Sequence, residues 1–177
     1  MKNILLIILA IILTLKPVLS FSQEIENPEN QKKISYAFIN EYGFSYNAPN
    51  MFFISINSVF VNGIRFNKTQ DEIGIGIGSD FYFILQTFPI FANYRHYFPS
   101  KKIIKPHINI GLGTQLSFWR GHEPWEDHKL RCAAGLYATF ATGFKIKAFS
   151  FSVGGFAKSI DRESFFGGAE IKMGYTF

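Results

Sequence analysis

The sequence has little of several features that mark common protein classes. It contains one cysteine, Cys132, among 177 residues, which excludes an intrachain disulfide framework and a cysteine-rich zinc or iron–sulfur site. Its longest apolar run, Ile4 to Leu15, is shorter than the roughly 20 residues that a membrane-spanning helix needs. No amphipathic helical stretch is present either. The sequence therefore favours neither a disulfide-stapled domain nor a helical membrane protein.

Aromatic residues, in contrast, are abundant. They make up 18% of the chain, with 21 Phe, and hydrophobic residues make up 47%. A disordered chain lacks this much ring surface, so the composition favours an ordered protein rich in β-structure. The length fits one domain, or one domain with a tail. The mean hydropathy of +0.09 lies between the values of soluble domains and helical membrane bundles.

Residues 1–22 have the layout of a cleavable signal peptide for Sec export. A basic start at Lys2 precedes the apolar run, and Ser20 and Ser22 place small residues at −3 and −1 before Gln23. The alternative is an uncleaved anchor helix. The residue directly after the expected cleavage point is Gln23 and not cysteine, so a lipoprotein anchor is not expected.

Cleavage would also change the charge balance. The chain has 18 basic and 13 acidic residues, a net charge of +5. Loss of Lys2 and Lys16 with the signal peptide leaves 16 basic residues and a net charge of +3. We therefore infer no nucleic-acid binding from the sequence pI of about 9.3.

The rest of the chain is a flexible periplasmic lead-in, 23–33, followed by a domain at 34–177 in which polar and apolar residues alternate. A period of two indicates β-strands. The C-terminal segment sets Ile171, Met173 and Tyr175 against Glu170 and Lys172. The same reading predicts eight strands, near 34–46, 52–66, 71–83, 86–98, 105–119, 129–146, 149–160 and 164–177.

The connections between these strands also alternate. Short polar turns are expected at 67–70, 99–102 and 147–148, whereas the other end carries one long loop, Arg120 to His128. An even number of strands with short turns at one end and longer loops at the other is typical of outer-membrane barrels. The sequence predicts an all-β fold, an eight-stranded antiparallel up-and-down transmembrane β-barrel.

Three observations indicate that the polar face points into the barrel. The first is glycine, which would weaken a solvent-exposed strand but suits a narrow lumen. It recurs on the polar face at Gly74, Gly76, Gly78, Gly111, Gly113, Gly135, Gly143, Gly154, Gly168 and Gly174. The second is charge of both signs on that face, which can pair inside a barrel. The acids are Glu41, Glu72, Asp80 and Glu170, and the bases are Arg65, Arg95, Arg131, Lys145, Lys158 and Lys172.

The third observation is the aromatic content of the apolar face, since barrels carry aromatic girdles toward lipid. These rings are Tyr36, Phe38, Tyr42, Phe44, Phe60, Phe66, Phe88, Tyr94, Phe118, Phe140, Phe149, Phe151, Tyr175 and Phe177. Cys132 has the same parity as these rings and is expected to face lipid as a small apolar residue. His107 falls on the lumen face, and His96 lies at a strand end. The alternatives are an ordinary mixed-charge surface and a soluble periplasmic ligand-binding barrel with its apolar face inward.

The final run, Glu170 to Phe177, resembles the terminal strand of bacterial outer-membrane β-barrel proteins. These end in an aromatic residue, and the barrel-assembly machinery reads that pattern. In this C-terminal assembly signal a glycine is usual near the position that Lys172 occupies here. The repeat Gly-Ile-Gly-Ile-Gly at 74–78, Phe88-Pro89-Ile90 and Tyr94-Arg95-His96-Tyr97-Phe98 are also similar to small porin-family (OmpA/OmpX-like) barrels. The resemblance covers 34–177 and implies the Gram-negative outer membrane as location. It also implies lipid, lipopolysaccharide and, through Phe177, the assembly machinery as partners.

Strand number limits the function. A transmembrane strand takes about 9–11 residues, so a sixteen-stranded porin would need on the order of 160, more than the exported chain has. An eight-stranded barrel is filled by side chains. We therefore expect a structural protein, or one whose loops serve recognition or adhesion, with no open general pore, no enzymatic activity and no cofactor. Its extracellular partner is unknown.

One dense polar cluster, 119–129, could carry chemistry. It contains Trp119, His122, Trp125, Asp127 and His128. His122, Asp127 and His128 are candidate ligands of a metal site, but their spacing matches no zinc motif. A lipid-modifying enzyme, such as a lipid A acyl hydrolase or transferase, could use His122 or His128 with Ser117 and a carboxylate, but this needs hydrogen-bond contact that a sequence does not establish. The plainer interpretation is a solvated loop. We assign no catalytic, cofactor-binding or metal-binding residue.

Overall fold

The structure, a computed structural model, describes residues 34–48, 54–82, 85–100, 103–120, 130–159 and 165–177. They form eight strands: β1 (Ile34–Ala48), β2 (Ile54–Phe66), β3 (Asp71–Phe81), β4 (Leu85–Tyr97), β5 (Ile104–Arg120), β6 (Leu130–Ile146), β7 (Phe149–Ser159) and β8 (Phe165–Thr176). The predicted signal peptide and lead-in lie outside the described residues. In the part that is described, no helix is long and apolar enough to cross a bilayer.

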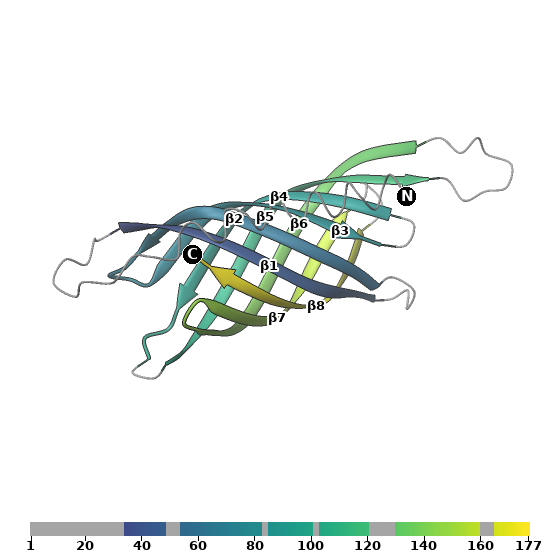
Figure 1. Cartoon of the computed structure of the whole chain (residues 1–177). Coiled ribbons are helices and arrows are strands. Elements are labelled where there is room, and N and C mark those ends of the chain that lie inside the picture. Colours follow the sequence, from purple (N-terminus) through teal and green to yellow (C-terminus); the bar gives the residue numbers. More distant parts are fainter. Residues whose placement is uncertain (1–33, 49–53, 83–84, 101–102, 121–129, 160–164) are drawn as a thin grey trace, which may run out of the picture. The chain divides into compact units, whose positions relative to one another are not determined.

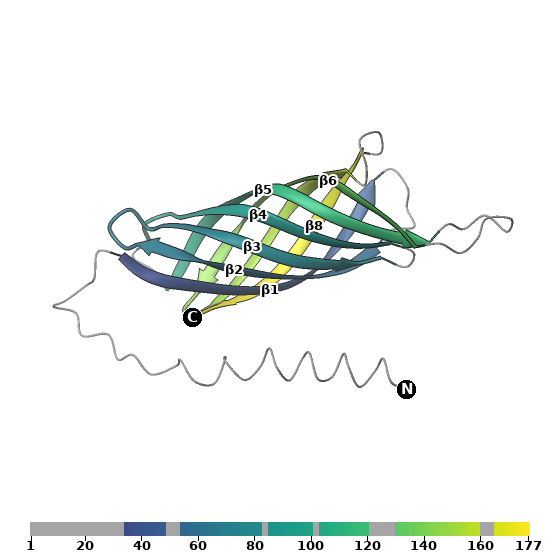
Figure 2. The same ribbon diagram turned by 90° about the horizontal axis from the view of Figure 1, so that it is seen from above.

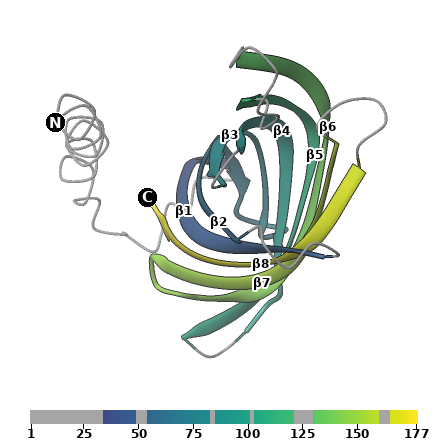
Figure 3. The same cartoon turned by 90° about the vertical axis from the view of Figure 1, so that its right-hand side faces the viewer.

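The eight strands form a closed barrel. Each strand pairs antiparallel with the next one in the chain, and β8 pairs with β1, from Ile39 opposite Thr176 to Ala48 opposite Gly167. Figures 1 and 3 show the strands inclined around the barrel wall. Because every strand has two neighbours, no sheet edge is left unpaired. The predicted eight-stranded antiparallel up-and-down barrel is confirmed, and strand bounds differ from the predicted ones by at most two residues.

The tight connections lie at the end of the barrel where β1 begins, here called the turn end; the opposite end is called the loop end. Figure 2 shows the β2–β3 turn at the turn end. In that turn the Gln70 amide donates to the Phe66 carbonyl at 2.8 Å. Gln70 and Lys147 have positive φ values of 61° and 54°. The favoured two-residue hairpin turns require a positive φ. Lys147 therefore has the backbone conformation of the tight turn that connects β6 to β7.

The outer wall of the barrel is apolar and its interior is polar. Ile75 and Leu136 are 66% and 68% exposed on the outside, whereas Arg95 is fully buried inside. None of the rings predicted to face lipid is buried, and Cys132 is exposed as predicted. A soluble barrel turns its apolar face inward, so this arrangement contradicts the soluble-carrier alternative.

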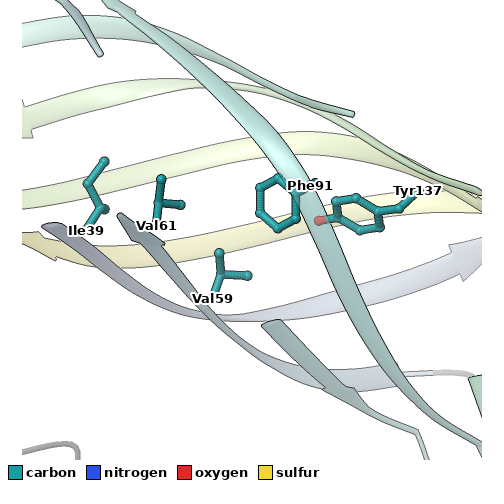
Figure 4. Close-up of a cluster of buried hydrophobic side chains, with 5 residues drawn as sticks. All are labelled: Ile39, Val59, Val61, Phe91 and Tyr137. Atoms are coloured by element: carbon teal, nitrogen blue, oxygen red, sulfur yellow. The ribbon is translucent and has the colours of Figure 1, made fainter. Parts of the chain in front are cut away.

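An apolar cluster occupies the interior between the two ends. It consists of Ile39, Val59, Val61, Phe91 and Tyr137, and Figure 4 shows the Phe91 and Tyr137 rings side by side. Their centroids lie 5.0 Å apart. We refer to this group as the apolar layer.

Glycine makes room for the apolar layer. A Cβ atom added to Gly76 would lie 2.3 Å from Cζ of Phe91, and one added to Gly111 would lie 3.0 Å from Cδ2 of the same ring. Real Cβ atoms essentially never approach other atoms as closely as 2.3 Å, so glycine at 76 leaves the space that the Phe91 ring occupies, and a Cβ at Gly111 would crowd the same ring. The predicted inward parity of the glycines thus has a specific cause at these positions.

Candidate functional site: the charged interior of the barrel

The interior contains acidic and basic side chains that pair with one another. Among the described residues, each of the four carboxylates predicted on the lumen face forms an ion pair. Glu41 pairs with Arg95 at 2.6 Å, Glu72 with Arg65, Asp80 with Lys158 at 2.5 Å, and Glu170 with Lys172 at 2.6 Å. The prediction that lumen charges pair is confirmed. The side chain of Arg131, also predicted there, lies outside what the structure describes.

The loop-end group is centred on Lys158. Its Nζ donates to Oδ2 of Asp80, which also accepts a hydrogen bond from Thr87 Oγ1 at 3.0 Å. The same ammonium lies 4.5 Å from the centroid of the Phe156 ring and 5.8 Å from that of Tyr82. An ammonium over an aromatic face gains electrostatic stabilisation. Carboxylate and rings together therefore replace the water that this buried lysine loses.

The turn-end group is centred on the Tyr97 ring. Tyr97 Oη donates to Oε2 of Glu72 at 3.0 Å, and Glu72 also pairs with Arg65. Arg65 Cζ lies 5.7 Å and Lys145 Nζ 5.2 Å from the ring centroid. The His107 ring lies 5.5 Å away, fully buried on the lumen face as predicted.

Further polar contacts connect strands between these ends. Asn93 Nδ2 donates to Oδ1 of Asn109 at 2.6 Å. Glu170 Oε1 accepts hydrogen bonds from Thr139 Oγ1 at 2.5 Å and from Lys172 Nζ at 2.6 Å. The Arg95–Glu41 pair joins β4 to β1. Because β4 and β1 are not neighbours in the barrel, this pair crosses the lumen.

On β3, the apolar layer lies between the residues of the two end groups. On β3, Glu72 belongs to the turn-end group and Asp80 to the loop-end group, and Gly76 between them faces the Phe91 ring. Eight residues of a strand span about 27 Å. Along β3 the lumen face thus carries a carboxylate, a glycine against the apolar layer, and a second carboxylate.

The sequence-based predictions do not include the large lumen rings of β4, Phe91 and Tyr97. Both have the same parity as Arg95, which was correctly predicted on the lumen face, so strand parity was the signal that could have found them. Parity does not show that glycines on neighbouring strands make room for the Phe91 ring.

Outside the lumen, one polar group lies near the turn end. Asp71 Oδ1 accepts a hydrogen bond from Tyr94 Oη at 2.9 Å and lies 2.7 Å from Nδ1 of His96. A carboxylate that orients a histidine is two-thirds of a hydrolase triad. Of the described residues, none places a hydroxyl or thiol in hydrogen-bond contact with the histidine. The group therefore ties β3 to β4, with His96 stacked edge-on against Phe98 at 4.9 Å.

The polar cluster 119–129 cannot be assembled from the described residues. His122, Trp125, Asp127 and His128 lie outside them, and Trp119 is the last residue but one of β5. Ser117, the candidate nucleophile, is fully buried in the lumen, where it accepts a hydrogen bond from Gln115 Nε2 at 3.4 Å. Within the described ranges, no group of three His, Cys, Asp or Glu side chains could hold a metal ion.

Comparison of the barrel with solved structures identifies its fold. The outer membrane enzyme PagL matches with a TM-score of 0.59 and 10% identity, over 77% of this chain and 98% of PagL. The N-terminal β-barrel domain of Pseudomonas aeruginosa OprF matches with a TM-score of 0.55 and 9% identity, over 80% and 97%.

Neisserial surface protein A matches with a TM-score of 0.53 and 10% identity, over 84% of this chain and all of that protein. The chain has the fold of the small eight-stranded outer-membrane barrels. No protein-family model matches the sequence. No curated protein matches it. At such low identities the similarity concerns architecture, and it extends to an enzyme as well as to other barrels.

Proposed function

We propose that this protein is an integral outer-membrane barrel with a structural or loop-mediated recognition role and no open general pore. The observation that carries the proposal is the inverted distribution of polarity. Apolar side chains such as Ile75 and Phe149 cover the outer wall, whereas buried ion pairs line the interior. In water an outer wall of this kind would aggregate, but in lipid it is the favourable surface.

The closed lumen supports the absence of a general pore. Arg95, Lys158 and Gln115 line the interior and are at most 1% exposed. The buried side chains of the apolar layer fill a further part of the interior. Solutes would have to displace both the layer and the ion pairs, and an unpaired buried charge is costly.

The loop-mediated role rests on composition at the loop end, where the sequence places the polar segment 121–129 between β5 and β6. Barrels of this class present their longer loops to the exterior. Export by the signal peptide at 1–22, and contact with lipid and lipopolysaccharide, belong to the same proposal.

The location is tested by cell fractionation followed by electrophoresis of boiled and unboiled membrane samples. We expect recovery in the outer-membrane fraction and a mobility difference between the two samples. Recovery in the soluble periplasm without a mobility difference would contradict the proposal. In planar bilayers, we expect the purified protein to give no stable conductance of porin size.

The role is tested by replacing 121–129 with a Gly-Ser linker of equal length. Cells that produce either form are compared for adherence to polystyrene and to laminin-coated wells, after the mobility difference has shown that both barrels assemble. We expect lower adherence for the linker variant. Mass spectrometry of lipid A, with and without the protein, should show no change; a new lipid A species that His122→Ala and His128→Ala both abolish would instead support an enzyme.

A further inference from the structure

Among the lumen side chains of the described residues that are not exposed, cations outnumber carboxylates by one. The cations are Arg65, Arg95, Lys145, Lys158 and Lys172, and the carboxylates are Glu41, Glu72, Asp80 and Glu170. The four ion pairs use every carboxylate and every cation except Lys145. A buried charge without a partner is strongly unfavourable, so the position of Lys145 requires an explanation.

Lys145 lies near the end of β6 and points into the lumen. It is 9% exposed, and the described contact of its ammonium is the face of the Tyr97 ring, at 5.2 Å. No carboxylate of the described residues lies within ion-pair distance of it. Its register partner on β5 is Lys105, which carries the same charge. Like charges opposite one another repel, so the protein itself adds positive potential at this end.

Two neighbouring side chains have hydrogen-bonding atoms without partners. His107 is fully buried, and neither of its ring nitrogens has a partner among the described residues. Arg95 is fully buried too, and its Nε and Nη1 atoms have none, although Nη2 binds Glu41. Buried polar atoms nearly always bind protein, water or an ion. Arg95 Nε and Nη1 therefore provide N–H donors without acceptors at the same end where charge is in excess, and one ring N–H of His107 adds another.

The unused donors gather around one ring. Lys145 and His107 approach the Tyr97 ring at 5.2 Å and 5.5 Å, and Arg95 precedes Tyr97 by two residues on the same face of β4. Arg65 also approaches this ring, and its side chain is 26% exposed. The group is thus buried on the lumen side and open to solvent through Arg65 at the turn end.

We propose that the turn end of the lumen binds one small monovalent anion, with chloride as the physiological occupant, held by Lys145, His107 and Arg95. One negative charge balances the excess cation. An anion also accepts hydrogen bonds from the Arg95 and His107 donors, whereas water would satisfy donors but leave the charge of Lys145 unbalanced. The proposal concerns the interior only and does not depend on the role of the external loops.

The test uses the full chain refolded in detergent micelles, with chloride replacing the bulky gluconate ion at constant ionic strength. We expect the midpoint of thermal unfolding to rise by a few degrees and then to saturate, as binding to the folded state requires. Lys145→Gln should abolish this rise. Lys68→Gln, which removes an exposed lysine from the β2–β3 turn at the same end, should retain it.

Crystals grown in bromide provide a second readout that does not depend on any variant. We expect an anomalous peak between Lys145, His107 and Arg95. The proposal is overturned by a wild-type midpoint that does not respond to chloride, by an equal response in Lys145→Gln, or by ordered water without an anomalous peak. If Lys145→Gln does not fold, Lys145→Arg, which retains the charge, must retain the chloride response.

Discussion

Lys158 on β7 and Asp80 on β3 form an ion pair across the barrel interior, with 2.5 Å between Nζ and Oδ2 and a sequence separation of 78. β3 and β7 are not neighbours in the barrel. The pair therefore connects opposite walls of the lumen at the loop end. Since both side chains are almost completely buried, each charge depends on the other for its stabilisation.

Removal of one partner of this pair should destabilise the barrel. We expect Asp80→Asn or Lys158→Met to lower the free energy of unfolding by about 3 kcal/mol, because the remaining charge stays buried without a partner. The double variant Asp80→Leu with Lys158→Met should recover most of the loss. Urea unfolding in lipid vesicles, followed by tryptophan fluorescence, measures these changes.

The control for that experiment is the partly exposed pair Asp71–His96 on the outer wall. Asp71→Asn should cost less than about 1 kcal/mol, as exposed pairs do. Equal losses for Asp80→Asn and Asp71→Asn would show that the lumen pair is hydrated.

Filling the space that Gly76 leaves should disturb the apolar layer. In Gly76→Ala the new Cβ would lie 2.3 Å from the Phe91 ring, so we expect a loss of about 1–3 kcal/mol, the usual effect of overpacking. Phe91→Leu in the same chain should restore part of it. Gly155→Ala on the outer wall, whose added Cβ meets one atom at 3.3 Å, should change the unfolding free energy little. A similar loss in both single variants would contradict the packing argument.

Whether the outer wall faces lipid can be tested by placing a charged side chain at the middle of a strand. Leu112 lies at the centre of β5 and is 60% exposed. Leu112→Arg should cost about 2–4 kcal/mol in vesicles because its charge would lie in hydrocarbon. Ile104→Arg, at the start of the same strand, should cost about 1 kcal/mol or less. Unchanged stability of Leu112→Arg would mean that this wall does not face lipid.

Cys132 is the only cysteine in the chain and gives a natural probe of the outer wall, on which it is exposed. A fluorophore attached to it should be quenched strongly by nitroxide-labelled lipid. In a Cys132→Ser background, Ser117→Cys places the thiol inside the lumen, where Ser117 is fully buried, and should react slowly or not at all with the same reagent. Efficient labelling of the lumen position would indicate an open interior.

Strand positions and facing follow directly from the local sequence. The alternation of Ile73, Ile75 and Ile77 with Glu72 and glycine has a period of two, and the pleat of a strand puts alternate residues on opposite faces. Parity alone therefore places Glu72 and Ile75 on opposite faces. Which face points inward follows less directly, because eight alternating segments also suit a soluble barrel; the burial of Arg95 and the exposure of Ile75 decide between the two.

The pairing of the lumen charges required the tertiary structure. From the sequence, Asp80 could pair with any basic residue on the polar face, and its neighbours in the chain do not indicate Lys158. The partner is decided by how the strands are staggered around the closed barrel, which brings β7 opposite β3. The same holds for the contact between Phe91 and Gly76, which joins positions on adjacent strands.

The amino-acid sequence by itself thus determined the strands, their facing and the barrel class, since these depend on periodicity and on turn residues within a few positions of one another. Only the tertiary structure decided which charges meet, which ring fills the lumen, and that Lys145 has no carboxylate beside it among the described residues. Several of these contacts, such as Asp80–Lys158 and Glu41–Arg95, join residues far apart in the chain. They arise when the stagger of the strands sets the height of each side chain in the lumen.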